Sequence, residues 1–296
     1  MAYLFLSLAL MAGTVKGYCG KRTGGHLSGS LHAMRATVLR MLLCTLIGFV
    51  MLLLDGGIHA ILPNTRSLVI FAVSGASTAL VVISWLISVK ESAYMMLDVS
   101  LMLGATVPIV LGLLLFDEKV SLLQWLGLCI LVGATVLMIS YNNSVKTKMT
   151  AKALLLLFVC GLSSGLADFS QKWFVEEFSD VPVSVFNLYT YAFCAIFTLI
   201  ALLIVSKKEN DAPAFPTKRV FPFILVMAIC LFLNSYFKTV AAKTLDAALL
   251  YPLSQGATLI LSSLMSVFFF KERLTLKGIL GITLCFVGLV VINVLG

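Results

Sequence analysis

Charged residues are scarce in this chain. Asp, Glu, Lys and Arg together make up 11% of its 296 residues, whereas hydrophobic residues make up 60%. A soluble domain has about a quarter of its residues charged, so this chain lacks the polar residues needed to cover itself in water. The composition excludes an ordinary soluble protein and predicts that lipid is its main solvent.

Patterns for metal binding and catalysis are also missing. The chain has seven cysteines and three histidines, but no C-x-x-C pair, H-E-x-x-H motif, P-loop or dinucleotide fingerprint. We therefore expect no cofactor, no metal site and no enzymatic activity. The net charge is +8, but the Lys and Arg residues lie in short gaps between apolar runs. That placement favours contact with the lipid bilayer and argues against binding to nucleic acid.

Long apolar runs dominate the rest of the chain. A helix needs about 20 apolar residues to cross a bilayer, and unpaired backbone groups in lipid exclude open strands. The runs form two groups of five around the polar linker 141–151: residues 2–20, 36–54, 67–89, 93–116 and 121–140, then residues 152–175, 183–206, 219–241, 246–270 and 275–295. The sequence predicts an all-α polytopic membrane protein with ten transmembrane helices.

One motif occurs at the end of each group of five. The segment "LLFDEKVSLLQWLGLCILVGATVLM" at Leu114–Met138 is similar to "FFFKERLTLKGILGITLCFVGLVVI" at Phe268–Ile292. Because an odd number of spans reverses the direction of the chain, the second copy is inverted relative to the first. We therefore predict two five-helix inverted repeats, residues 1–140 and 152–296. Such repeats are typical of transporters, although gene duplication alone can leave this symmetry in a structural bundle.

The repeated motif itself predicts a hinge and packing element rather than a substrate site. Glu118 and Glu272 lie in short turns between consecutive helices. There a carboxylate accepts hydrogen bonds from free N–H groups of the next helix and balances Lys119 or Arg273.

The motif F-x-E-K/R-L/V-S/T-L, followed by a Gly-bearing helix and repeated in a five-plus-five chain, resembles the drug/metabolite transporter (DMT) superfamily, EamA type. The first helix, "AGTVKGYCGKR", is similar in having small residues before a Lys, although Ala12 stands where many members carry Trp. The resemblance implies a ten-helix secondary transporter with a central cavity between its halves. It leaves the substrate open, since members transport amino acids, nucleosides, sugars, amines and drugs.

Polar residues inside spans are costly in lipid and mark candidate functional positions. One face of the helix at 152–175 carries Ser164, Asp168 and Gln171, and one face of the helix at 246–270 carries Tyr251 and Gln255. Aromatic faces, amides and a carboxylate suit an amine, an amino acid, a nucleoside or a similar solute. Plain contacts between helices are the alternative. The predicted substrate-binding residues are Trp85, Ser164, Asp168, Gln171, Asn234, Tyr251 and Gln255.

Two carboxylates, Asp98 and Asp168, lie well inside spans. A carboxylate that loses its water between helices binds a proton more readily, so both are candidates for proton coupling. Each also has a possible basic companion at similar depth, Lys16 for Asp98 and Lys238 for Asp168. Internal ion pairing without transport of protons is therefore the alternative.

Two other functions stay open at this point. A lipid-headgroup flippase would share every feature above. The segment "GLSSG" at Gly161–Gly165 also matches the G-x-S-x-G elbow of serine hydrolases, which requires a strand–turn–helix and a histidine base. For the transporter, we expect a multi-pass protein of the plasma membrane that acts on a small molecule as a monomer or homodimer. The Lys and Arg pattern places linker 141–151 in the cytoplasm and both termini outside, whereas the resemblance implies both termini inside.

Overall fold

The computed structural model of the chain describes residues 1–24, 26–27, 29–55, 59, 64–90, 97–140, 151–207, 217–270 and 276–295. These residues form helices and turns, with no strand among them. The helices are α1 (Ala2–Gly24), α2 (Gly29–Leu54), α3 (Thr65–Lys90), α4 (Leu97–Gly104), α5 (Thr106–Leu115), α6 (Leu122–Ser140), α7 (Ala151–Glu177), α8 (Val183–Ser206), α9 (Thr217–Ala242), α10 (Ala247–Phe270) and α11 (Leu276–Val290), which continues into the π-helical turn η4 (Val291–Leu295). The all-α fold class is confirmed.

The predicted runs are helical where the structure describes them, apart from the end residues Phe116, Ser121 and Asp246 and one interruption. The run predicted at 93–116 is divided into α4 and α5 at Ala105. Pro108 explains the break, because proline has no N–H to donate to the carbonyl of Gly104 and its ring clashes with that carbonyl. Residues 93–96 and nearly all of the predicted linker, residues 141–150, lie outside the described part of the chain.

Apolar side chains cover the outside of the molecule. Within the described residues, six helices are long and apolar enough to cross a membrane, and three shorter apolar helices accompany them. Large hydrophobic side chains are exposed on these helices, for example Leu46 and Phe49 on α2 and Ile196 and Leu203 on α8. Side chains of this kind are stable at such positions only in lipid. The protein is therefore a multi-pass membrane protein.

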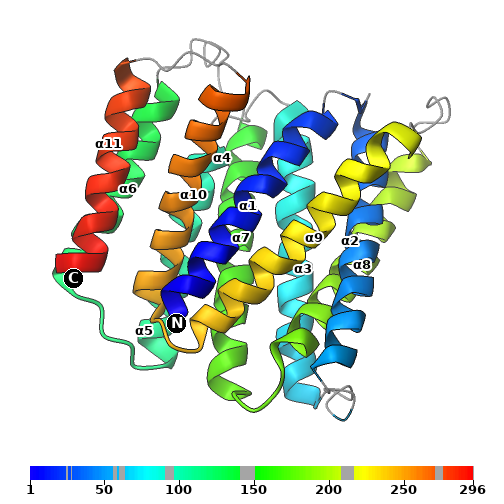
Figure 1. Cartoon of the computed structure of the whole chain (residues 1–296), viewed down its shortest axis with the longest axis horizontal. Coiled ribbons are helices and arrows are strands. Elements are labelled where there is room, and N and C mark those ends of the chain that lie inside the picture. Colours follow the sequence, from blue (N-terminus) through cyan, green and yellow to red (C-terminus); the bar gives the residue numbers. More distant parts are fainter. Residues whose placement is uncertain are drawn as a thin grey trace.

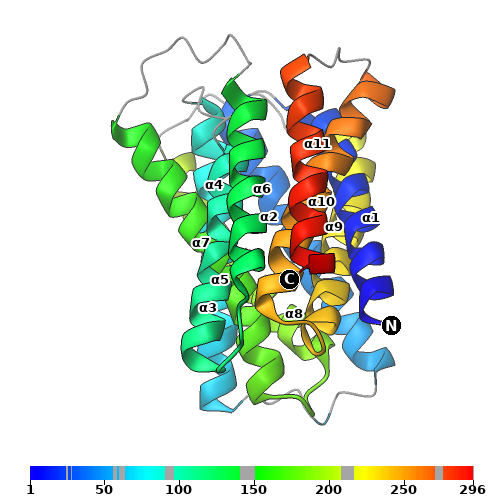
Figure 2. The same ribbon diagram turned by 90° about the vertical axis from the view of Figure 1, so that its left-hand side faces the viewer.

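The helices pack side by side, and both chain termini lie at the same end of the bundle (Figure 1). The most extensive contacts join α1 to α9, α2 to α8, α3 to α7 and α6 to α11, and Figure 2 shows α6 and α11 next to each other. Each of these pairs takes one helix from residues 1–140 and one from residues 151–296. The core is therefore built between the two parts of the chain rather than within each.

Glycines bring α4 and α7 into backbone contact. A Cβ atom added at Gly161 would lie 2.4 Å from the carbonyl oxygen of Ser100, and one added at Gly165 would lie 2.3 Å from that of Gly104. The Ser100 hydroxyl also donates a hydrogen bond to the carbonyl of Leu157. This contact fixes α7 within the bundle one turn before the acidic residue at position 168.

Candidate functional site

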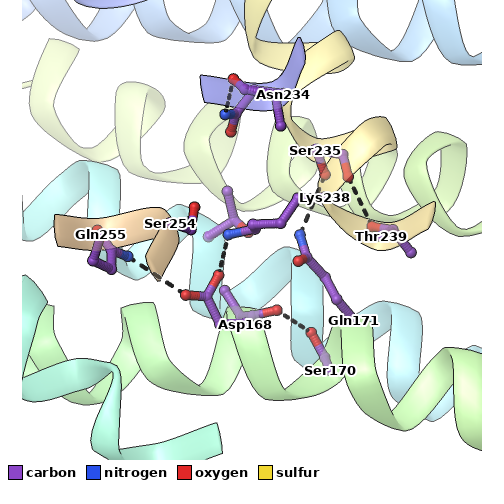
Figure 3. A network of polar contacts seen from close by, with 12 residues as sticks. Asp168, Ser170, Gln171, Asn234, Ser235, Lys238, Thr239, Ser254 and Gln255 are labelled. Atoms are coloured by element: carbon purple, nitrogen blue, oxygen red, sulfur yellow. Dashed lines mark hydrogen bonds and ion pairs between the residues drawn. The ribbon is translucent and has the colours of Figure 1, made fainter. Parts of the chain in front are cut away.

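An ion pair inside the bundle joins α7 to α9. Asp168 Oδ1 lies 2.5 Å from Lys238 Nζ, and the two side chains are 8% and 12% exposed. The other carboxylate oxygen, Oδ2, accepts a hydrogen bond from Gln255 Nε2 of α10 at 3.5 Å. Figure 3 shows Asp168 between Lys238 and Gln255. Three helices therefore meet at a single carboxylate.

Further polar and aromatic groups surround this pair. Gln171 Nε2 donates to Ser235 Oγ at 3.5 Å, which makes a second link between α7 and α9. The Oε1 atom of Gln171 is buried without a hydrogen-bond partner in the described structure. Lys238 Nζ lies 5.7 Å from the ring centroid of the fully buried Tyr251, within the range of a cation–π interaction. An unsatisfied buried amide oxygen such as Gln171 Oε1 is costly.

The structure brings some of the predicted substrate-binding residues together and separates others. Four of them gather where α7, α9 and α10 meet: Asp168, Gln171, Tyr251 and Gln255. Asn234 instead donates its amide N–H to the carbonyl of Ala9 at 2.7 Å and so holds α9 to α1. Ser164 lies one turn before Asp168 on α7 and is half-buried.

The remaining predicted residues lie where the structure describes no side chain. Trp85 belongs to α3 and Asp98 to α4, but both side chains fall outside the described part of the chain. Their assigned roles in substrate binding and proton coupling remain predictions, and so does the pairing of Asp98 with Lys16. The companion predicted for Asp168, Lys238, is the residue that pairs with it.

A second buried ion cluster lies where the α5–α6 turn, the end of α7 and the start of α10 meet. Lys172 Nζ is 2.9 Å from Glu118 Oε1 and 2.8 Å from Glu176 Oε1, and the side chains of Lys172 and Glu118 are 4% and 6% exposed. Lys172 Nζ also donates to the carbonyl oxygens of Ala242 and Leu245. The positive charge of Lys172 is therefore fully compensated by neighbouring groups.

The position of Glu118 corrects one prediction from the sequence. Its Oε2 atom accepts the N–H of Ala247, the first residue of α10, at 2.9 Å. Glu118 thus caps a helix of the other half of the chain and pairs with Lys172, so its predicted partners, the next helix and Lys119, were wrong. A reciprocal pair of hydrogen bonds between Ser121 and Gln124 caps α6 instead.

Backbone geometry in the α5–α6 turn allows Glu118 to reach across. Asp117 has φ of 53°, a left-handed conformation that reverses the chain just before Glu118. Gly112 provides the space, since a Cβ atom there would lie 2.8 Å from Glu118 Oε2. The repeated motif therefore links the two halves of the chain at this end of the bundle.

The buried positions of Lys172 and Arg40 were not predicted, because both were counted among the loop charges. The signal was present, because Lys172 lies inside the predicted run 152–175 and Arg40 inside the predicted run 36–54. A charge within an apolar run that remains long enough to span the bilayer is a candidate for burial. Both residues are indeed within helices, on α7 and α2.

The serine-hydrolase motif does not have the structure that its chemistry requires. Ser163 is 4% exposed and lies inside α7, which is a continuous helix over Ala151–Glu177. The strand–turn–helix of a nucleophile elbow is therefore not formed in this segment. Among the described residues, no group of three or more His, Cys, Asp or Glu side chains is placed to hold a metal ion.

Comparisons with known proteins agree with this architecture. Residues 151–294 match the EamA-like transporter family. A solved structure, described only as the crystal structure of a protein, superposes with a TM-score of 0.80 over 99% of this chain and 96% of that chain, at 15% sequence identity. At that identity the likeness shows the fold alone. No curated protein matches the sequence.

Proposed function

We propose, because residues 151–294 belong to the EamA-like transporter family, that this protein is a secondary active transporter of a small organic metabolite in the plasma membrane. The family match indicates a membrane transporter of the drug/metabolite type. The ion pair of Asp168 and Lys238 supports the more specific proposal. Apolar side chains at these positions would stabilise a purely structural bundle at least as well, since desolvation offsets much of the attraction in a buried pair.

We further propose that residues 1–140 and 152–296 are inverted repeats that move relative to each other. The packing pattern supports this. If the first five spans are matched in order to the second five, the α1–α9 contact corresponds to the α3–α7 contact, whereas α2–α8 and α6–α11 each join matched helices. A two-fold axis in the membrane plane produces such a pattern, and transporters with this symmetry alternate access to a central site.

Proton coupling, in this proposal, depends on Asp168. Because α7, α9 and α10 all contribute groups to its carboxylate, relative movement of these helices changes its partners. A carboxylate that loses Lys238 and Gln255 in a surrounding of low dielectric takes up a proton, and it releases that proton when the partners return. One proton would then be exchanged in each transport cycle.

Substitution of Asp168 by Asn is expected to abolish accumulation driven by a pH gradient while leaving exchange of labelled substrate intact. Asn keeps the size of the side chain and part of its hydrogen bonding but cannot titrate. The measurement is uptake into liposomes, with and without a pH gradient, of a compound selected by thermal stabilisation of the protein from amines, amino acids and nucleosides. Asp180→Asn, the same change at an exposed residue of the α7–α8 turn, serves as the control.

Full accumulation by the Asp168→Asn variant would contradict coupling at this residue and leave Asp98 as the candidate. If Asp98→Asn also retained full accumulation, the protein would be a uniporter or would use another ion.

The lipid-flippase alternative is separated by a second assay on the same liposomes. A transporter of soluble metabolites is expected to leave a fluorescent phospholipid in the inner leaflet inaccessible to a membrane-impermeant quencher. Rapid quenching of the inner-leaflet lipid, together with no uptake of soluble compounds, would favour the flippase.

A further inference from the structure

Two cations that the mechanism above does not use lie inside the helix bundle. Lys16 is on α1 and Arg40 is on α2, and both side chains are half-buried. Lys16 is within electrostatic reach of Arg40 and of Lys238, and its charge is repelled by both. The Nε atom of Arg40 is buried and has no hydrogen-bond partner in the described structure.

No anion of the described residues compensates these two charges. The groups that act electrostatically on Lys16 and Arg40 are other cations, thiols and the phenol of Tyr191, with no carboxylate among the described residues. The nearby carboxylate, Asp168, is already paired with Lys238. Among the described residues, this region therefore has more positive than negative charge, although unpaired charges are costly inside a membrane protein.

Lys172 shows how the same chain treats a cation that has a structural role. Its ammonium group contacts two carboxylates and two backbone carbonyls. No described residue surrounds Lys16 or Arg40 in this way, so their burial contributes no comparable stabilisation. A cluster of cations that lowers stability is expected where a ligand supplies the missing negative charge.

We propose that Lys16 and Arg40 bind an oxyanion, carboxylate or phosphate, carried by the transported substrate. The guanidinium group of Arg40 offers paired N–H donors that match two oxygens of such a group, and Lys16 of α1 adds a second positive charge. This inference rests on the proposed transport function and narrows its substrate. A simple amine would be repelled, whereas an amino acid or a phosphorylated metabolite carries the required group.

Binding of compounds that differ in one group tests the proposal on the purified full-length protein. Serine, ethanolamine and phosphoethanolamine share an amine but carry a carboxylate, no anion and a phosphate, respectively, and acetate and inorganic phosphate present the anions alone. Stabilisation by the anionic compounds, but not by ethanolamine, is expected. Tighter binding of serine and acetate would identify the oxyanion as a carboxylate. Tighter binding of phosphoethanolamine and inorganic phosphate would identify it as a phosphate. Failure of every anion to stabilise the protein would overturn the proposal.

Two variants separate a binding role from a structural one. Arg40→Met is expected to weaken anion binding by about 30-fold or more, as for loss of one partner of a buried charge pair, and to raise the melting temperature of the ligand-free protein by relieving charge repulsion. Arg40→Lys keeps the charge and should retain part of the binding. Arg35→Met, earlier on α2, is the matched control and should leave anion affinity unchanged.

A lower melting temperature of the ligand-free Arg40→Met protein, with unchanged anion affinity, would show that Arg40 is structural and would refute the inference. Uptake assays distinguish this failure from failure of the transport function. Anion binding without uptake of any bound compound would support the anion site and contradict the proposed transport function. Uptake of amines that is insensitive to Arg40→Met would support the transport function and contradict the anion site.

Discussion

Replacement of Lys172 by Met is expected to destabilise the protein by about 3–5 kcal/mol, the usual effect of removing one partner of a buried ion pair. The Glu118 side chain is 6% exposed, so without Lys172 its charge would be left in the interior, where the N–H of Ala247 is its remaining partner among the described residues. Thermal unfolding of the purified protein measures the effect. Glu118→Gln should be milder, because an amide oxygen can still accept from Ala247.

The adjacent Lys119 provides a stringent control, because it lies next to Glu118 in the sequence and is exposed. Lys119→Met is expected to change stability by less than about 0.5 kcal/mol, as for most surface substitutions. Equal destabilisation by Lys119→Met and Lys172→Met would contradict the pairing. Combining Lys172→Met with Glu118→Gln should recover part of the stability lost in Lys172→Met, since the double variant buries no unpaired charge.

Substitution of Gly165 by Ala is expected to disrupt the contact between α4 and α7 and destabilise the protein by about 3 kcal/mol or more, the upper range for overpacking. The added methyl group would lie 2.3 Å from the carbonyl oxygen of Gly104 and 2.5 Å from the Val107 side chain. Because the first obstacle is backbone, no change of rotamer relieves it. The yield of monodisperse protein and its melting temperature report the effect.

Gly133 of α6 offers the matched control. A Cβ atom there would have no neighbour within 4 Å. Gly133→Ala is therefore expected to stabilise the protein slightly, by up to about 1 kcal/mol, through the higher helix propensity of Ala. A loss of stability in Gly133→Ala as large as in Gly165→Ala would show that close helix contact is not the cause.

Most of the helices could be predicted from the sequence because the bilayer imposes a minimum length of apolar helix. The run 183–206, for instance, coincides with α8. The break at Ala105 was missed, although Pro108 was visible, because the prediction rested on hydropathy, which proline scarcely changes.

In the candidate site, contacts could be predicted only between residues that lie at the same depth in the membrane. Depth placed Lys238 level with Asp168, and the two form an ion pair. The partners of Glu118 could not be found in this way, because Lys172 and Ala247 belong to helices of the other half and no local spacing relates them. Arg40 was counted with the loop charges, so its proximity to Lys16 emerged only from the fold, in which α1 and α2 both pack against α9.

The capping of α10 by Glu118 has a consequence for the order in which the protein is assembled during synthesis. Asp168 and Lys172 lie within α7, and each Lys or Asp in the middle of a helix opposes insertion by about 3 kcal/mol. Residues 1–140 leave the ribosome first and bring Glu118 into the membrane before Lys172 arrives. We therefore expect the first half of the chain to assist the insertion of α7. Its Glu118 is also already in place to accept the N–H of Ala247 when α10 is made.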